Sequence, residues 1–158
     1  MSGIIGGAGS RSGVIGHTEI EYEEGTWTPI IADVANGHQY GNATALASYR
    51  KIGKLVFICG IIVTTTPPST APSGAIRMQA LPFSPSTNQL HSTGCISFGN
   101  GQGHSLGGDY TITGRVNHTD KIVNLYKWSA TTGTSSVTAA EWLNAGEGQF
   151  GGSYITDI

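Results

Sequence analysis

The sequence predicts an all-β protein, an antiparallel β-sandwich or jelly-roll-like knob, on the basis of three observations. Glycine supplies 24 of the 158 residues, about twice its average share, which favours turns over long helices. Charged residues make up 11% of the chain, against about 25% in an average soluble protein, so the residues that sustain exposed helices are scarce. Apolar residues also recur at alternate positions in several short stretches, which is the period of a half-buried strand.

The length is that of one domain with a short N-terminal extension. We expect a Gly-rich neck over residues 1–16 and a β-sandwich domain over residues 17–158, since one domain takes about 100–200 residues. The neck repeats itself ten residues apart, as SGIIG at 2–6 and SGVIG at 12–16. Its paired Ile and Val side chains favour burial against further copies of the same segment, and a flexible leader is the alternative.

The first part of the domain predicts an edge strand and a hairpin. Residues 17–24 alternate apolar or hydroxyl side chains with glutamates, which indicates a half-buried strand. Residues 25–29 end in a proline that cannot donate a backbone hydrogen bond, so this stretch suits a sheet edge. After a loop at residues 36–42, strands are expected within residues 48–66, on either side of a tight turn at 51–54.

The strand from Leu55 to Val63 is apolar on both of its faces. The odd-numbered positions form one face and the even-numbered positions the other: Leu55, Phe57, Cys59, Ile61 and Val63, and Val56, Ile58 and Ile62. In an antiparallel sandwich only one face of a strand meets the core. The second face therefore needs a cover, from more of this chain or from another subunit. Two cysteines cannot form a disulfide framework. We expect Cys59 to be a buried thiol, because it lies inside the most apolar segment, where a reduced thiol behaves as a small hydrophobic group.

The rest of the chain predicts further short strands, for a total of about nine. The expected extended stretches are residues 75–83, 94–98, 109–116, 122–128 and 149–158. Residues 117–121 join two of these as a hairpin. Residues 99–108 are too glycine-dense for a regular element and too polar for burial, which predicts a loop. Residues 138–141 predict one helical turn or a tight turn.

Charge and hydropathy argue against two classes of function. The net charge is −2 and the isoelectric point is about 6.2, so no clustered basic face is available for the phosphates of a nucleic acid. The longest apolar run is about half the length of a membrane helix. No charged-then-apolar leader precedes it, so we expect neither membrane insertion nor secretion.

No catalytic, metal or cofactor signature is present. The acidic run Glu19, Glu21, Glu23 and Glu24 lies beside His17, but side chains along one strand face are nearly parallel, and no second His or Cys completes a metal shell. The sequence motifs of serine hydrolases, P-loop proteins and zinc proteases are absent. We therefore expect a protein that is not an enzyme, although a carboxylate pair assembled between subunits stays open.

Binding requires less than catalysis, namely aromatic, amide and carboxylate side chains on loops that a rigid sheet supports. The predicted loops supply such side chains, and the alternative is that the histidines are exposed bystanders and the aromatic rings belong to the core. The receptor-binding candidates are Asn100, Gln102, His104, Asp109, Tyr110, Asn117 and His118.

Four further segments stand in a distinctive order and spacing: YEEGTWTP at 22–29, YRKIGKLV at 49–56, LPF at 81–83 and GSYITD at 152–157. Together they resemble the C-terminal tip domains of tailed-bacteriophage tail fibres, over residues 16–158. The resemblance implies a homotrimeric β-sandwich at the tip of a virion fibre, made in the host bacterial cytoplasm. It also implies partners among other phage tail proteins and a host surface glycan or protein as receptor.

The trimer and core scaffold is expected to include Trp27, Leu55, Phe57, Ile61 and Ile62. The resemblance carries no receptor contact over to this chain, because the receptor loops of such tips vary. Two alternatives to a receptor-binding tip stay open. One is a capsid or baseplate decoration protein of jelly-roll type, and the other is a tailspike-like depolymerase of surface polysaccharide.

Overall fold

The computed structural model describes residues 21–88, 94–107, 110–118 and 120–157. The secondary structure of these residues is a set of ten strands. They are β1 (Tyr22–Trp27), β2 (Ile30–Asp33), β3 (Gly41–Ile52), β4 (Leu55–Thr66), β5 (Ile76–Gln79), β6 (Cys95–His104), β7 (Thr111–Val116), β8 (Ile122–Ser129), β9 (Gly133–Ser136) and β10 (Trp142–Ile155). The predicted neck at residues 1–16 lies outside the described residues. In the part of the chain that is described, no helix reaches the length and apolarity of a membrane crossing.

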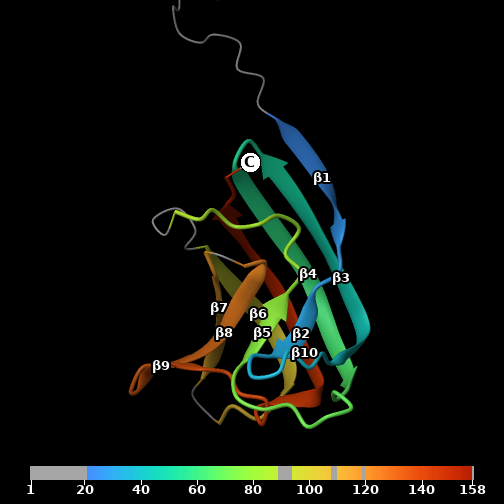
Figure 1. The fold of residues 1–158 in the computed structure, drawn as a ribbon. Helices are drawn as coiled ribbons and strands as arrows, with labels where there is room; N and C mark the ends of the chain where they lie inside the picture. Colours follow the sequence, from blue (N-terminus) through green and yellow to red (C-terminus); the bar gives the residue numbers. More distant parts are fainter. Residues whose placement is uncertain (1–20, 89–93, 108–109, 119, 158) are drawn as a thin grey trace, which may run out of the picture.

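All of these strands belong to one antiparallel sheet. The order is β1-β3-β4-β10-β6-β7-β8-β5-β2, and β9 pairs with β8. The sheet curls so that the long strands β3, β4 and β10 lie on one side and the short strands β2, β5 and β8 on the other (Figure 1). The all-β, antiparallel, sandwich-like fold class is therefore confirmed, with both layers built from one continuous sheet.

The core fills the space inside the curl. Val56 and Ile62 of β4 are fully buried, as are Met78 of β5 and Val123 of β8. Burial of one such side chain contributes about 1.5–3 kcal/mol to the free energy of unfolding. The inward residues of β4 are thus the even-numbered ones, a choice that its sequence leaves open because both faces are apolar.

A buried polar contact ties β4 to β10 at one end of the sheet. The indole Nε1 of Trp142 donates to Thr64 Oγ1 at 3.0 Å, and Thr64 Oγ1 donates to the carbonyl oxygen of Gly146 at 3.1 Å. These groups lie out of reach of water, so each polar atom finds its partner inside the protein.

The hairpin between β3 and β4 matches its prediction. Ile52 pairs with Leu55, which leaves a two-residue turn of Gly53 and Lys54. Gly53 has a φ of 56°, and glycine at the first position of such a turn is the preference of type II′ hairpins. Residues 138–141 form a turn closed by the bond from the backbone N–H of Glu141 to the Thr138 carbonyl oxygen.

The predicted loop at residues 99–108 is wrong over its first half. β6 continues to His104 and pairs with β10, which itself begins at Trp142 rather than at residue 149. The glycines permit this pairing because the two backbones approach closely. A Cβ on Gly101 would lie 3.0 Å from the Glu147 carbonyl oxygen, and one on Gly103 only 2.1 Å from that of Ala145.

Candidate functional site

The outward surface of β3 and β4 is rich in apolar side chains. Residues that face each other across an antiparallel pair share one side of the sheet. The register sets Leu46 opposite Ile61, Ser48 opposite Cys59 and Arg50 opposite Phe57. Leu46 is 68% exposed and Phe57 is 44% exposed. We call the surface formed by Leu46, Ser48, Phe57, Cys59 and Ile61 the outer face.

The predicted scaffold residues divide between the two sides of the sheet. Ile62 is fully buried, and the ring of Trp27 packs edge-on against Phe150 with centroids 6.0 Å apart. Leu55, Phe57 and Ile61 point outward instead. The cover that Phe57 needs does not come from the residues that the structure describes.

The thiol of Cys59 is exposed, so the prediction of a buried cysteine is wrong. The cysteine has an odd number in β4 and therefore shares the outward side with Phe57. Its sulfur lies 3.3 Å from Ser48 Oγ, which places both polar atoms within an otherwise apolar surface.

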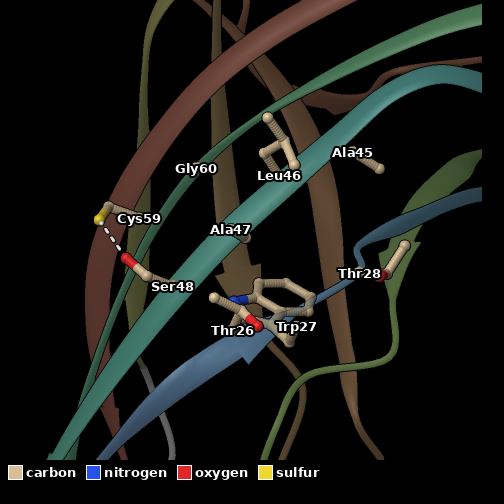
Figure 2. A pocket seen from close by; sticks show the side chains of 9 residues that line it. All are labelled: Thr26, Trp27, Thr28, Ala45, Leu46, Ala47, Ser48, Cys59 and Gly60. Carbon is tan, nitrogen blue, oxygen red and sulfur yellow. Dashed lines mark hydrogen bonds between the residues drawn. The ribbon is translucent and has the colours of Figure 1, made fainter.

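A hollow of about 480 Å³ opens where β1 ends and β3 continues (Figure 2). Trp27 is the largest side chain that lines it, and small residues line it beside β3 and β4: Ala45, Ala47 and Gly60. The indole Nε1 of Trp27 is buried without a hydrogen-bond partner among the described residues. Hydroxyl groups of Thr26, Thr28 and Ser48 surround these apolar surfaces.

A second hollow, of about 440 Å³, continues along the sheet toward β10 and shares Ser48 and Cys59 with the first. Arg50 and Phe57 line it together with the backbone of Gly151 and Gly152. At the far end of β1, Arg50 Nε lies 3.6 Å from the Glu24 carboxylate. The outer face thus combines ridges and hollows with a charged rim, the anatomy of a contact surface.

The receptor-binding candidates do not form one cluster. Gln102 and His104 lie at the end of β6, and Tyr110 directly precedes β7. Asn117 and His118 follow the opposite end of β7, where Asn117 Nδ2 donates to Asp120 Oδ2 at 3.1 Å. Asn100 lies within β6. Asp109 lies outside the described residues.

Two of these candidates, His104 and Tyr110, line one cleft of about 170 Å³, which we call the β6 cleft. Its apolar lining includes Phe98, Leu106 and Ile112, and Glu147 of β10 also lines it. Glu147 was not predicted. The signal that marks it is its position between two glycines of β10, next to the equally glycine-rich β6.

His104 is held in a defined orientation and charge state. Its Nε2 donates to the Glu147 carbonyl oxygen at 2.7 Å, and its ring packs on Trp142 with centroids 4.5 Å apart. Burial lowers the pKa of His104 below its ordinary value, although the bond to the Glu147 carbonyl raises it. Burial therefore favours the neutral imidazole.

Polar groups lie around the cleft, and one of its two neighbouring carboxylates is paired with a cation. Gln102 Nε2 donates to Glu147 Oε2 at 3.3 Å. The ammonium of Lys127 lies 5.1 Å from the centre of the Tyr110 ring and bonds to the Glu141 carboxylate. Burial raises the pKa of Glu141, but bonds from Lys127 and Thr138 outweigh this and lower it. Glu141 therefore neutralises Lys127.

Within the described ranges, no three His, Cys, Asp or Glu side chains gather as a group that could hold a metal ion. Near the cleft, each described carboxylate has a partner of its own. Glu147 accepts a hydrogen bond from the neutral Gln102 amide, and Glu141 accepts one from the ammonium of Lys127. The arrangement offers stacking surfaces and hydrogen-bonding groups, which are the components of a binding site.

No family model matches the sequence, and no curated protein matches it. Among solved structures, the crystal structure of the Dettilon tailspike protein is similar, with a TM-score of 0.69 over 85% of this chain. The chain folds like part of a tailspike. Sequence identity is 11%, and the chain spans 24% of the length of that tailspike, so the likeness concerns the fold.

Proposed function

We propose that the chain is a structural protein of a phage virion, a trimeric tail tip that attaches the particle to a bacterial surface receptor, with a glycan as the favoured receptor. The fold of a tailspike segment and the tail-fibre resemblance of residues 22–29 and 49–56 both support a place in the phage tail. The observation that carries the proposal is the outer face. Exposed apolar surfaces of this kind mark interaction sites.

Copies of the same chain suit the outer face because a projection of this face lies beside a hollow that reaches around the end of β1. Leu46 projects from β3, 68% exposed, beside the hollow of about 480 Å³ that Trp27, Ala45 and Gly60 line. In a cyclic ring of three copies, Leu46 of each copy can enter the hollow of the next copy, and the third copy then contacts the first. The Glu24 and Arg50 side chains would then remain at the rim.

Solution mass tests the assembly. We expect light scattering to give three times 16.4 kDa for the full chain, and the same multiple after removal of residues 1–16. The variant with Leu46→Asp and Phe57→Asp should run as a folded monomer, because a buried unpaired carboxylate is costly. Leu143→Asp is the matched control, since this leucine is 45% exposed but lies outside the outer face. A monomeric full chain contradicts the proposal.

Attachment is tested separately on cells. We expect the fluorescently labelled trimer to bind a subset of strains in a bacterial panel and to release no reducing ends from their surface polysaccharide. Release of reducing ends would indicate the depolymerase alternative. If the labelled trimer binds no strain, and virions that lack the protein still adsorb normally, the decoration-protein alternative is indicated.

A further inference from the structure

A hollow of about 530 Å³, which we call the end hollow, lies where β4 ends and β10 begins. Pro67 lines it just after β4, and Leu143 lines it at the start of β10. β1 begins at the other end of the sheet, where Tyr22 pairs with Ile52 (Figure 1). The end hollow shares no lining residue with the two hollows of the outer face. Assembly through the outer face therefore leaves it open, at the end opposite to the start of β1.

Hydrogen bonds hold the walls of the end hollow in place. The backbone N–H of Ala139 donates to the Gly74 carbonyl oxygen at 2.9 Å, which joins the segment before β10 to the loop after β4. The indole of Trp142 is fixed by its bond to Thr64, and the backbone N–H of Tyr40 donates to a carbonyl oxygen of β2. The hollow is thus formed in advance, and a ligand has little of the protein to order when it binds.

The lining of the end hollow is mostly apolar and carries no charged side chain. All of its lining residues belong to the described part of the chain, and prolines, alanines and Leu143 make up most of them. Glu141, the nearest carboxylate along the sequence, bonds instead to Lys127 and to the backbone N–H of Thr138. A charged group in the hollow would lose water without meeting a counter-charge on the lining, which is costly. The end hollow therefore favours an uncharged ligand.

Few polar groups of the lining are available to a ligand. The exposed Asn144 amide has no hydrogen-bond partner among the described residues, and an amide can both donate and accept. The Tyr40 hydroxyl contacts the Ala139 carbonyl oxygen at 3.5 Å, and the Trp142 indole N–H is already bonded. A sugar with a hydroxyl on every free carbon would leave some of them unpaired against apolar side chains. A ring with a methyl or acetyl group would instead bury that group there.

We propose that the end hollow binds one uncharged sugar ring of a host surface glycan through a methyl group, that of a 6-deoxyhexose or of an N-acetyl group. The inference rests on the proposed receptor role and names the ligand class and its site. Pro67 and Leu143 contact the methyl group, and the Asn144 amide bonds to a polar group of the same ring.

Saturation-transfer NMR titrations on the full chain test the ligand class with two pairs of probes. Methyl α-L-rhamnopyranoside and methyl α-L-mannopyranoside differ only in the hydroxyl group at C6. The methyl glycosides of N-acetylglucosamine and glucose differ only at C2. In at least one pair we expect the member with the additional methyl group to bind about fourfold more tightly, the value of one buried methyl group. Absence of binding by all four probes, or equal affinity within both pairs, overturns the proposal.

Variants of exposed residues test the location. Ala140→Trp fills the end hollow and should abolish binding of the preferred probe. Ala130→Trp is the matched control, since Ala130 is exposed in the turn between β8 and β9 and should leave the Kd unchanged. Asn144→Ala should weaken both members of the preferred pair about fivefold, whereas Leu143→Ala should reduce the preference for the member with the methyl group. An unchanged Kd in Ala140→Trp overturns the site.

Cell adsorption separates this inference from the proposed function. If the parent chain adsorbs to bacteria and the Ala140→Trp variant adsorbs equally well, receptor binding lies elsewhere and this inference alone is overturned. A parent chain that adsorbs to no strain overturns the receptor role itself, whatever the sugar probes show.

Discussion

At the scale of single residues, Asp33 is the most constrained charge in the described part of the chain. Its side chain is fully buried, and its two oxygens accept bonds from the backbone N–H groups of Asn36, His38 and Ser73 at 2.9–3.1 Å. Burial raises the pKa of the carboxylate, but these donors outweigh it and lower the pKa from 3.8 to about 2. Asp33 thereby fastens two loops to the end of β2.

This geometry predicts acid sensitivity. The folded pKa lies below the unfolded one, so the stabilisation is present above about pH 4 and is lost as the pH falls toward 2. We expect Asp33→Asn to lower the free energy of unfolding at pH 7 by about 1–3 kcal/mol. The difference in the free energy of unfolding between the variant and the parent should be smaller at pH 2 than at pH 7, as measured by urea unfolding. An equal gap at both pH values contradicts the prediction.

At the scale of elements, the sequence predicts those strands whose signal is local. β4 and the β7–β8 hairpin alternate strongly and carry turn residues, and both are found where expected. The second half of β6 and the first half of β10 are not predicted, because their glycines reflect the close approach of two backbones, which is a property of the strand pair. Residue type alone makes His104, Tyr110 and Asn117 binding candidates. Asn117 lies at the opposite end of β7 from Tyr110, and this distance depends on the direction of the strand in the sheet, which a local sequence pattern does not reveal.

Gly60 of β4 lies at a similarly close approach of two backbones, in this case β4 and β3. A Cβ at this position would lie 2.6 Å from both the Ala47 Cβ and the Leu46 carbonyl oxygen. We expect Gly60→Ala to lower the free energy of unfolding by about 1–3 kcal/mol through overpacking. Gly99→Ala meets open space and should stay within about 0.5 kcal/mol of the parent. Comparable urea midpoints for the two variants would refute this account.

At the scale of the whole molecule, the proposed trimer would link folding to assembly through the outer face. If copies bind one another only when folded, mass action stabilises the folded state as concentration rises. We expect the melting temperature of the parent chain to increase with protein concentration in calorimetry. The variant with Leu46→Asp and Phe57→Asp should show a lower melting temperature that is independent of concentration. A parent melting temperature that does not move with concentration counts against a reversible trimer.

The direction of the strands has a mechanical consequence. Tyr22 pairs with Ile52 at the end of the sheet where Ile155 pairs with Leu55, and His104 pairs with Trp142 at the other end (Figure 1). A pull on the β6 cleft that is resisted at Tyr22 therefore runs along the strands. It loads the hydrogen bonds between β1 and β3 in shear, all at once, instead of opening them one after another. Separating β1 from β3 under such a load then requires many of these bonds to break together.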